Sequence, residues 1–264
     1  MTPWTGGPLN EQIWCRLCPN PGPMTLEGTN TWVVSAPGAD EAVVIDPGPL
    51  DEEHLQRVLA DVTGRGARVA LVLFTHEHWD HAESLERMRE LTEAPLRGNF
   101  PGAEPLADGE VLEVGGLRLR AVASPGHTMA SVCFVLEGDG VLFTGDTILG
   151  RGTTVVAHPD GELSAYLQTL ETIAGLARGG EVSTLAPGHG PVLADALGTV
   201  EQYAAHRQER LAQVREAASG QQEQSRSDLA DAVVERVYAD VPRQVWPAAR
   251  QSVLAQLDYL GMGR

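Results

Sequence analysis

Two hydrophobic patterns alternate along the chain as far as residue 217. Short runs rich in Val, Leu and Ile are typical of strands, whereas apolar positions repeated every three or four residues are typical of helices. The first pattern predicts strands at residues 31–35, 42–45, 69–75, 117–123, 131–136, 141–144 and 182–185. The second predicts helices at residues 83–92, 163–177 and 201–217. This succession predicts a mixed α/β fold.

The pattern changes at residues 219–228, which are polar and almost without apolar side chains. Such a stretch is typical of a linker. Two short helical patterns follow, at 228–238 and 246–260, and Pro242 lies between them, where it stops the first. We therefore predict a large domain over residues 1–218 and a small helix-turn-helix module over residues 219–264.

Length and composition agree with this division. With 264 residues and 42% hydrophobic residues, the chain can bury a core, and its longest apolar runs have only the length of strands. We therefore expect no membrane span. Residues 1–8 lack the order of basic, apolar and small residues found in a signal peptide, and only three Cys occur. Both observations predict a cytoplasmic protein.

The charge is strongly acidic and unevenly distributed. The net charge is −17, and every basic residue is Arg because the chain has no Lys. This excludes Schiff-base chemistry on a lysine and a Walker A phosphate loop. Residues 1–200 carry 27 acidic side chains against 11 Arg, whereas residues 201–264 carry 9 against 8. The large domain should therefore repel polyanions at long range.

Candidate chemistry begins where the predicted strand 69–75 ends. The next six residues are His76-Glu77-His78-Trp79-Asp80-His81, which place three imidazoles and a carboxylate on one short loop. Imidazole and carboxylate are ligands that suit Zn²⁺. One loop cannot aim four such ligands at a single ion without strain. Two metal positions are therefore expected.

Three further strand ends supply candidate ligands. His127 follows Ser124-Pro125-Gly126, Asp146 follows Thr144-Gly145, and His189 follows Ala186-Pro187-Gly188. A loop or capping role would explain any one of these residues alone. Together with the cluster at 76–81, they include five of the eight histidines of the chain. This joint pattern predicts a metal site.

The ligand series His76-x-His78-x-Asp80-His81, His127, Asp146 and His189 resembles that of the metallo-β-lactamase-fold hydrolases. Residues 20–31, 124–128, 144–154 and 187–191 are more closely similar to the β-lactamase-like protein 2 group. The resemblance implies an αββα metallo-β-lactamase sandwich followed by a C-terminal winged-helix-like module. It also implies that His76, His78 and His127 hold one zinc ion, that Asp80, His81 and His189 hold a second, and that Asp146 bridges the two.

A mechanism follows from this arrangement. Two zinc ions per chain would share a water, lower its pKa towards neutrality and polarise the bond to be cleaved, so that no Ser or Cys nucleophile is needed. Asp80 is the candidate for orienting the resulting hydroxide and passing its proton to the leaving group. The resemblance also suggests Asn30, Thr153 and Thr154 as substrate contacts. The native metal, zinc as opposed to manganese or iron, stays open.

Two substrate classes compete. The resemblance implies cleavage of single-stranded RNA for some members and hydrolysis of thioesters, esters or lactones for others. An acidic domain without Lys offers few phosphate contacts, and this favours a small ester, thioester or lactone. A metal-dependent endoribonuclease remains the alternative. A di-iron redox protein and a metal-free interaction module are two further hypotheses, which metal analysis would separate from a hydrolase.

The C-terminal module offers little basic surface. Only Arg243 and Arg250 lie on or beside its second helix, and the chain stops where a wing hairpin would begin. DNA-reading modules usually present a basic face. We therefore expect the module to pack against the large domain or to contact a second subunit in a homodimer. We also expect His54, His158 and His206 to be solvated or capping residues, and Cys15 and Cys18 to have no redox role.

Overall fold

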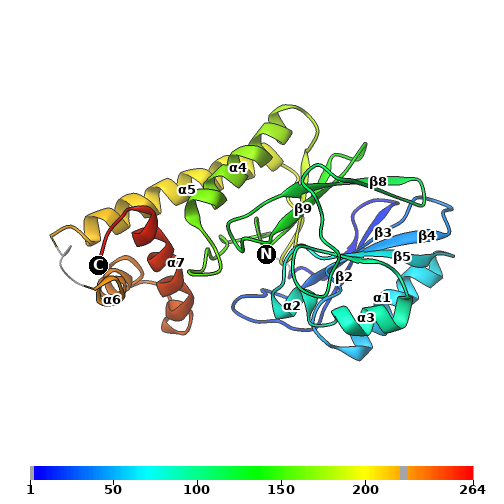
Figure 1. Ribbon diagram of the computed structural model, residues 1–264, viewed down its shortest axis with the longest axis horizontal. Coiled ribbons are helices and arrows are strands. Elements are labelled where there is room, and N and C mark those ends of the chain that lie inside the picture. The colour runs from blue at the N-terminus through cyan, green and yellow to red at the C-terminus, as the bar shows by residue number, and fades with distance from the viewer. Residues whose placement is uncertain (1–2, 221–224, 264) are drawn as a thin grey trace.

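The computed structural model describes residues 3–220 and 225–263 and shows two β-sheets stacked between layers of helices (Figure 1). The first sheet has the order β1-β2-β3-β4-β5-β6. Its strands are β1 (Gly7–Pro8), β2 (Ile13–Leu17), β3 (Asn30–Val34), β4 (Glu41–Ile45), β5 (Arg68–Leu73) and β6 (Leu96–Arg97). Neighbours are antiparallel from β1 to β4, and β4, β5 and β6 are parallel.

The second sheet has the order β11-β10-β9-β8-β7. Its strands are β7 (Val111–Val114), β8 (Leu117–Ala123), β9 (Val132–Leu136), β10 (Val141–Gly145) and β11 (Thr184–Pro187). Only the pair β10 and β11 is parallel. The parallel pairs of the two sheets, β4 with β5 and β10 with β11, carry the residues discussed below at their carboxyl ends.

Helices cover the outer face of each sheet. Beside the first sheet lie α1 (Glu52–Gly64), α2 (Trp79–Ala82) and α3 (Leu85–Thr92), and beside the second lie α4 (Leu163–Arg178) and α5 (Ala196–Ala217) (Figure 1). The inner faces share a core that includes Trp32, Phe134 and Phe143. Every residue of β9 is buried because apolar layers pack on both of its faces, which explains why it forms a continuous apolar run. The predicted αββα sandwich is confirmed.

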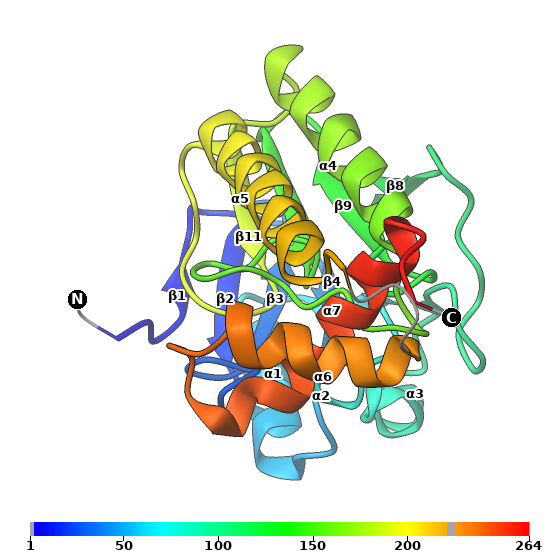
Figure 2. The ribbon, with the colours of Figure 1, turned by 90° about the vertical axis from the view of Figure 1, so that its left-hand side faces the viewer.

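The last helices form a separate group, which we call the C-terminal lobe (residues 225–263). It contains α6 (Arg226–Val237), the 3₁₀ turn η1 (Arg243–Val245) and α7 (Trp246–Tyr259). Figure 2 shows α6 and α7 beside the end of α5, and Val214 of α5 belongs to the apolar core of the lobe. Ala255 of α7 also packs into the core that contains α4 and α5. The lobe therefore packs against the large domain.

The division of the chain at residue 218 stays a prediction. The helix α5 serves both parts, since its first turns pack on the second sheet and its last turn packs in the C-terminal lobe. The predicted linker at 219–228 falls partly outside the described residues, which omit 221–224. No described helix combines the length and the apolar content that crossing a bilayer requires.

One sequence prediction about a histidine is wrong. His54, expected to be solvated or capping, lies on the inner side of α1 and is only 1% exposed. Its Nε2 lies 2.9 Å from the hydroxyl of Thr31. Burial lowers its pKa to about 4, so the imidazole is neutral near pH 7.

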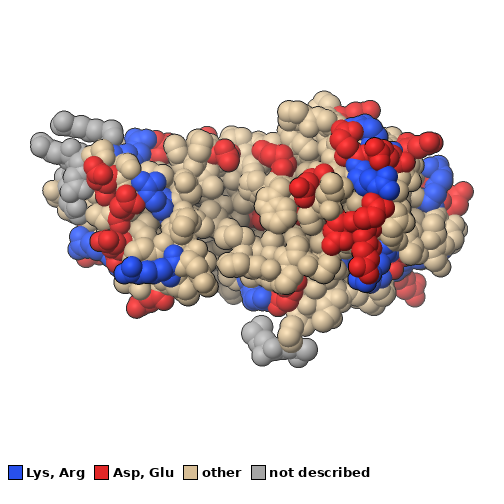
Figure 3. All heavy atoms as spheres, turned by 90° about the horizontal axis from the view of Figure 1, so that it is seen from below, with Lys and Arg blue, Asp and Glu red and all other residues tan. Residues whose placement is uncertain are grey.

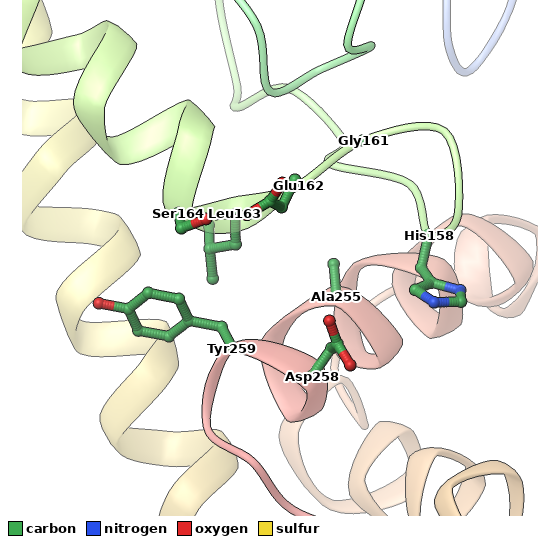
Figure 4. A pocket seen from close by; sticks show the side chains of 8 residues that line it. All are labelled: His158, Gly161, Glu162, Leu163, Ser164, Ala255, Asp258 and Tyr259. Carbon is green, nitrogen blue, oxygen red and sulfur yellow. Dashed lines mark hydrogen bonds between the residues drawn. The ribbon is translucent and has the colours of Figure 1, made fainter.

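A small cavity separates the loop before α4 from α7 (Figure 4). Its lining includes His158, Leu163 and Tyr259, and its volume is about 50 Å³. This volume holds one or a few water molecules. The small cavity is therefore a packing defect between the two parts of the molecule and is too small for a substrate.

Candidate metal centre

All seven predicted ligands lie at one edge of the two sheets. His76 follows β5 after two residues, and α2 turns the chain immediately afterwards so that Asp80 and His81 face back towards it. His127, Asp146 and His189 follow β8, β10 and β11. The carboxyl ends of these strands meet in space, and this is why residues separated by more than 100 positions come together.

One group of three nitrogen atoms converges at a single point. His76 Nε2 lies 3.0 Å from His78 Nδ1, and His127 Nε2 lies 3.1 Å from the same atom. Ligands of a tetrahedral zinc site with bonds of about 2.1 Å lie about 3.4 Å from one another. The spacing of these three nitrogens therefore suits one metal ion.

A second group lies next to the first. His81 Nε2 and His189 Nε2 are 3.1 Å apart, and Asp80 Oδ2 lies 3.2 Å from His189 Nε2. The three side chains are buried, so no layer of water separates them. They form a second set of ligands that could hold a metal ion.

Asp146 faces both groups. Its Oδ1 lies 3.3 Å from His189 Nε2 and 3.4 Å from His81 Nε2, whereas its Oδ2 lies 3.8 Å from His127 Nε2. Oδ1 is buried and has no hydrogen-bond partner among the described residues. A buried carboxylate oxygen without a partner is costly unless a cation approaches it. The donor set is therefore suited to metal binding, with Asp146 within reach of histidines of both groups.

The outward-facing ring nitrogens support the same conclusion. Nδ1 of His127 lies 2.7 Å from the carbonyl oxygen of Val155, and Nδ1 of His189 lies 3.1 Å from that of Gly28. A carbonyl can only accept, so each Nδ1 carries the proton. Nε2 of each ring then faces the centre, the orientation in which it could bind a metal ion.

Asp46 is a functional residue that the sequence patterns did not reveal. It follows β4, is 1% exposed, and accepts hydrogen bonds from the backbone N–H and the hydroxyl of Thr75, both at 2.7 Å. Its Oδ2 also lies 2.9 Å from Nδ1 of His81. The backbone of Asp46 has φ +51°, which is strained for a non-glycine residue. Asp46 therefore orients His81, and its position directly after a strand was the signal available in the sequence.

The centre divides into neutral and charged groups. Burial lowers the pKa of His76 well below its usual value, and it also lowers that of His127. At His189, burial is outweighed by the carboxylates of Asp146 and Asp80, which raise the pKa to about 9. Burial likewise opposes ionisation of Asp146, but the two neighbouring histidines hold its pKa well below its usual value. The centre thus keeps its carboxylates ionised.

The predicted substrate contact at Asn30 needs correction. Asn30 is fully buried, and its amide oxygen accepts a hydrogen bond from the indole of Trp4. Its amide nitrogen donates to the carbonyl oxygens of Pro187 and Gly190, at 2.9 and 2.8 Å. With no exposed surface and its amide groups engaged, Asn30 cannot contact a substrate. Instead, it fixes the loop that carries His189.

Thr153 and Thr154 remain predicted substrate contacts. The hydroxyl of Thr154 lies 3.2 Å from Nδ1 of His127, so this residue also helps to orient that ring. Both threonines line a cavity of about 340 Å³ beside the candidate metal centre, which we call the interlobe cavity. Trp79, on the ligand loop, is 61% exposed and is therefore not a core residue.

The interlobe cavity has a wall in each part of the molecule. His127 and Asp146 lie at its inner end, and side chains of η1 and α7 close its far side. Half-buried His206 lines it too. The two cysteines of the 15–18 segment are buried, and burial raises the pKa of each, which disfavours the reactive thiolate form.

Comparison with known families identifies both parts of the chain. The profile of the metallo-beta-lactamase superfamily matches residues 24–99 and 98–189. The profile of the beta-lactamase associated winged helix domain matches residues 230–261. The predicted winged-helix relationship of the C-terminal lobe is thus confirmed, although no strand follows α7 within the described residues.

Curated relatives cover most of the chain. The lactamase-like protein nscB of Neosartorya fischeri is 34% identical over 77% of this chain, and the match spans 60% of the relative. The atrochrysone carboxyl ACP thioesterase of Aspergillus fumigatus is 31% identical over 94% of this chain and 82% of the relative. The beta-lactamase-like protein 2 homolog of Caenorhabditis elegans is 30% identical, with 93% and 82% covered.

Solved structures share the fold. A metallo-beta-lactamase family protein from Thermus thermophilus superposes with a TM-score of 0.78 at 23% identity, covering 96% of this chain and 94% of that one. A beta-lactamase domain protein from Burkholderia ambifaria gives a TM-score of 0.79 at 20% identity, with 99% and 89% covered. Both superpositions include the C-terminal lobe.

Proposed function

This chain belongs to the metallo-beta-lactamase superfamily of hydrolases, and from that premise we propose that it uses two zinc ions to hydrolyse a small ester, thioester or lactone. The observation that carries the proposal is the pair of three-residue groups that could each hold a metal ion, with the carboxylate of Asp146 3.3 Å from His189 of one group and 3.8 Å from His127 of the other. When bound, two such ions lower the pKa of a water between them and polarise the oxygen of the scissile carbonyl.

The remaining roles, metal binding and proton transfer, fall to residues of the chain. His76, His78 and His127 would hold one ion, Asp80, His81 and His189 the other, and Asp146 would touch both. Asp80 Oδ2 lies beside His189 Nε2, while Asp80 Oδ1 has no hydrogen-bond partner among the described residues. We assign to Asp80 Oδ1 the acceptance of the proton from the attacking water and its transfer to the leaving group.

Two neighbouring histidines explain why Asp80 can act as this base. Although burial favours its protonated form, the hydrogen bond from His189 and the charge of His81 lower its pKa. The carboxylate is therefore ionised at neutral pH and ready to accept a proton.

Three observations support a small acyl substrate. The interlobe cavity has a volume of about 340 Å³, within the range of roughly 300–1,000 Å³ usual for small-molecule sites. The net charge of −17 disfavours a long polyanion. One relative that matches 94% of the chain is named a thioesterase, which makes a thioester the first substrate to test.

The test is a comparison of kcat/KM for zinc-loaded protein on acyl thioesters, lactones and single-stranded RNA, each at two salt concentrations. We expect turnover of at least one acyl class, with little dependence on salt. Efficient cleavage of RNA without turnover of any acyl compound would overturn the assignment of substrate. The Asp80→Asn variant is the matched control, because turnover that belongs to this site should fall in it by at least about 10²-fold.

A further inference from the structure

We propose that the interlobe cavity binds an acyl compound that carries an anionic group beyond an apolar stretch, and that Arg207 and Arg210 recognise this anion. The inference rests on the proposed function, since it names the substrate class of the same site. It assigns the selection of the substrate to α5 together with the C-terminal lobe.

The position of the cavity sets the direction of the substrate. His127 and Asp146 lie at one end, so a scissile carbonyl placed at the candidate metal centre enters the cavity there. The rest of the molecule must then extend towards the C-terminal lobe, which supplies the opposite wall. In Figure 3 the middle of the visible face, between this lobe and the rest of the protein, carries few charged side chains.

Apolar side chains from both parts line the path between the two ends. Met24, Leu26 and Leu149 belong to the large domain. Val241 and Val245 come from the segment between α6 and α7 in the C-terminal lobe. A hydrocarbon stretch in contact with these surfaces is stabilised by about 25 cal/mol for each Å² that it removes from water. The cavity is thus suited to a chain of methylene groups or its equivalent.

Two arginines of α5 give the cavity a positive charge. Arg207 is only 5% exposed, its Nη2 donates to the carbonyl oxygen of Thr154, and its Nε is buried without a partner. Arg210 donates to the side chain of Gln213 and lies over the ring of Tyr238 at 4.7 Å. Among the described residues, neither guanidinium forms an ion pair.

Most other arginines in the described part of the chain have acidic partners, the exceptions being Arg65, Arg215, Arg236 and Arg243. Arg151 at the rim of the cavity pairs with Glu27 at 2.6 Å, and Arg226 in the C-terminal lobe pairs with Asp258 at 2.7 Å. The one carboxylate that lines the cavity is Asp146, which we assign to the metal ions. A charge buried without a counter-ion is costly. The cost at Arg207 is offset when a ligand brings an anion.

The anion can come from either side of the scissile bond. A carboxylate at the far end of the acyl chain and a phosphate on the leaving thiol both present oxygens that match a guanidinium. The shared requirement is negative charge separated from the carbonyl by an apolar stretch. Neutral imidazole at His206 adds a polar group to the same wall, since its Nδ1 is buried without a partner.

The experiment measures binding by calorimetry to zinc-loaded protein and does not depend on turnover. One arm compares suberate with octanoate, which have the same chain length but two carboxylates and one. The other compares 4′-phosphopantetheine with pantetheine. A charge-assisted hydrogen bond contributes about 1.5–3 kcal/mol, so we expect the anionic member of at least one pair to bind about tenfold tighter or better.

Variants separate this contact from general electrostatics. Arg210→Gln should reduce the preference to less than about threefold, whereas Arg215→Gln, an equal change of charge on an exposed part of α5, should preserve it. If Arg210→Gln does not fold, Val245→Glu places a negative charge in the same wall and should weaken the anionic ligand more than its partner. Equal binding within both pairs by the wild type overturns the proposal. If the preference is present while no acyl compound is hydrolysed, the cavity assignment stands and the proposed function fails.

Discussion

The candidate metal centre and the wall that faces it across the interlobe cavity are built in different ways. The centre is made of residues that directly follow strands or lie on the short helix α2, and most of them are buried. The facing wall is made of half-buried side chains of η1 and α7 in a lobe that follows a polar segment. Residues fixed by strand ends suit chemistry that requires fixed positions. Side chains of a helical wall can be substituted without disturbing that centre, so such a wall suits selection of the substrate.

The strongest way to test this contrast is to remove a reacting group from the centre. Asp80→Asn keeps the size of the side chain but removes its capacity to accept a proton. We expect kcat to fall by at least about 10²-fold on every substrate, the usual scale for general acid–base catalysis, with the fold and the metal content little changed. Steady-state kinetics and metal analysis of the same preparation check this. A loss confined to one substrate class would place Asp80 in substrate recognition instead.

The next largest effect should come from the residue that orients a ligand. Asp46→Asn removes the charge that holds His81 while leaving all seven predicted ligands in place. Loss of such an outer partner typically costs about 10–100-fold in metal affinity, and we expect that range here. Titration with a competing chelator measures it. Unchanged affinity for both ions would show that the hydrogen bond from His81 has no part in binding.

On the other side of the cavity, the effect should fall on binding alone. Val241→Asp removes apolar contact from the wall and adds a charge that repels an anion, so KM should rise about tenfold while kcat changes less than about twofold. Gln244→Asp, an exposed position of η1, is the matched control and should leave both constants unchanged. A fall in kcat equal to the rise in KM would contradict the assignment of chemistry to the centre and of substrate binding to the facing wall.

The smallest expected effect concerns the pH dependence of the unfolding free energy, to which buried His54 contributes. His54 is neutral in the folded protein because burial lowers its pKa to about 4, and an unfolded histidine titrates near 6.5. Below that value the unfolded chain binds a proton that the folded chain does not, so stability is lost as the pH falls. Between about pH 7 and pH 5.5 the wild type should lose about 1 kcal/mol more unfolding free energy than His54→Gln. Urea unfolding at the two pH values tests this, and parallel curves would contradict it.

The seven predicted ligands can be picked out from the sequence because they obey a local rule, and the structure brings them together. Four of them lie in one run of six residues, and His127 and His189 each follow a strand and a glycine. Asp46 obeys the same rule, but a single Asp after a strand is common and no neighbouring histidine marks it. Its role depends on Thr75 and His81, which only the folded sheet brings within hydrogen-bond distance.

Two features depend on tertiary contacts that no local pattern encodes. Asn30 was predicted to contact the substrate. Its amide oxygen instead accepts a hydrogen bond from Trp4, 26 residues away, and its amide nitrogen donates one to the carbonyl oxygen of Gly190. The interlobe cavity combines side chains from five separate parts of the chain, around residues 23–26, at 127, and around 146–155, 206–210 and 238–252. The sequence therefore predicts the two sheets and the site of chemistry, whereas the shape and charge of the substrate wall follow only from the packing of α5 and α7.

Metal content is the most direct test of the central claim that Asp146 is shared between two ions. Elemental analysis of purified wild type should give two divalent ions per chain. The variant His189→Ala should retain about one, because the group of His76, His78 and His127 is intact, whereas Asp146→Ala should lose affinity at both positions. A wild type that holds a single tight ion, with binding insensitive to Asp146→Ala, would contradict the account.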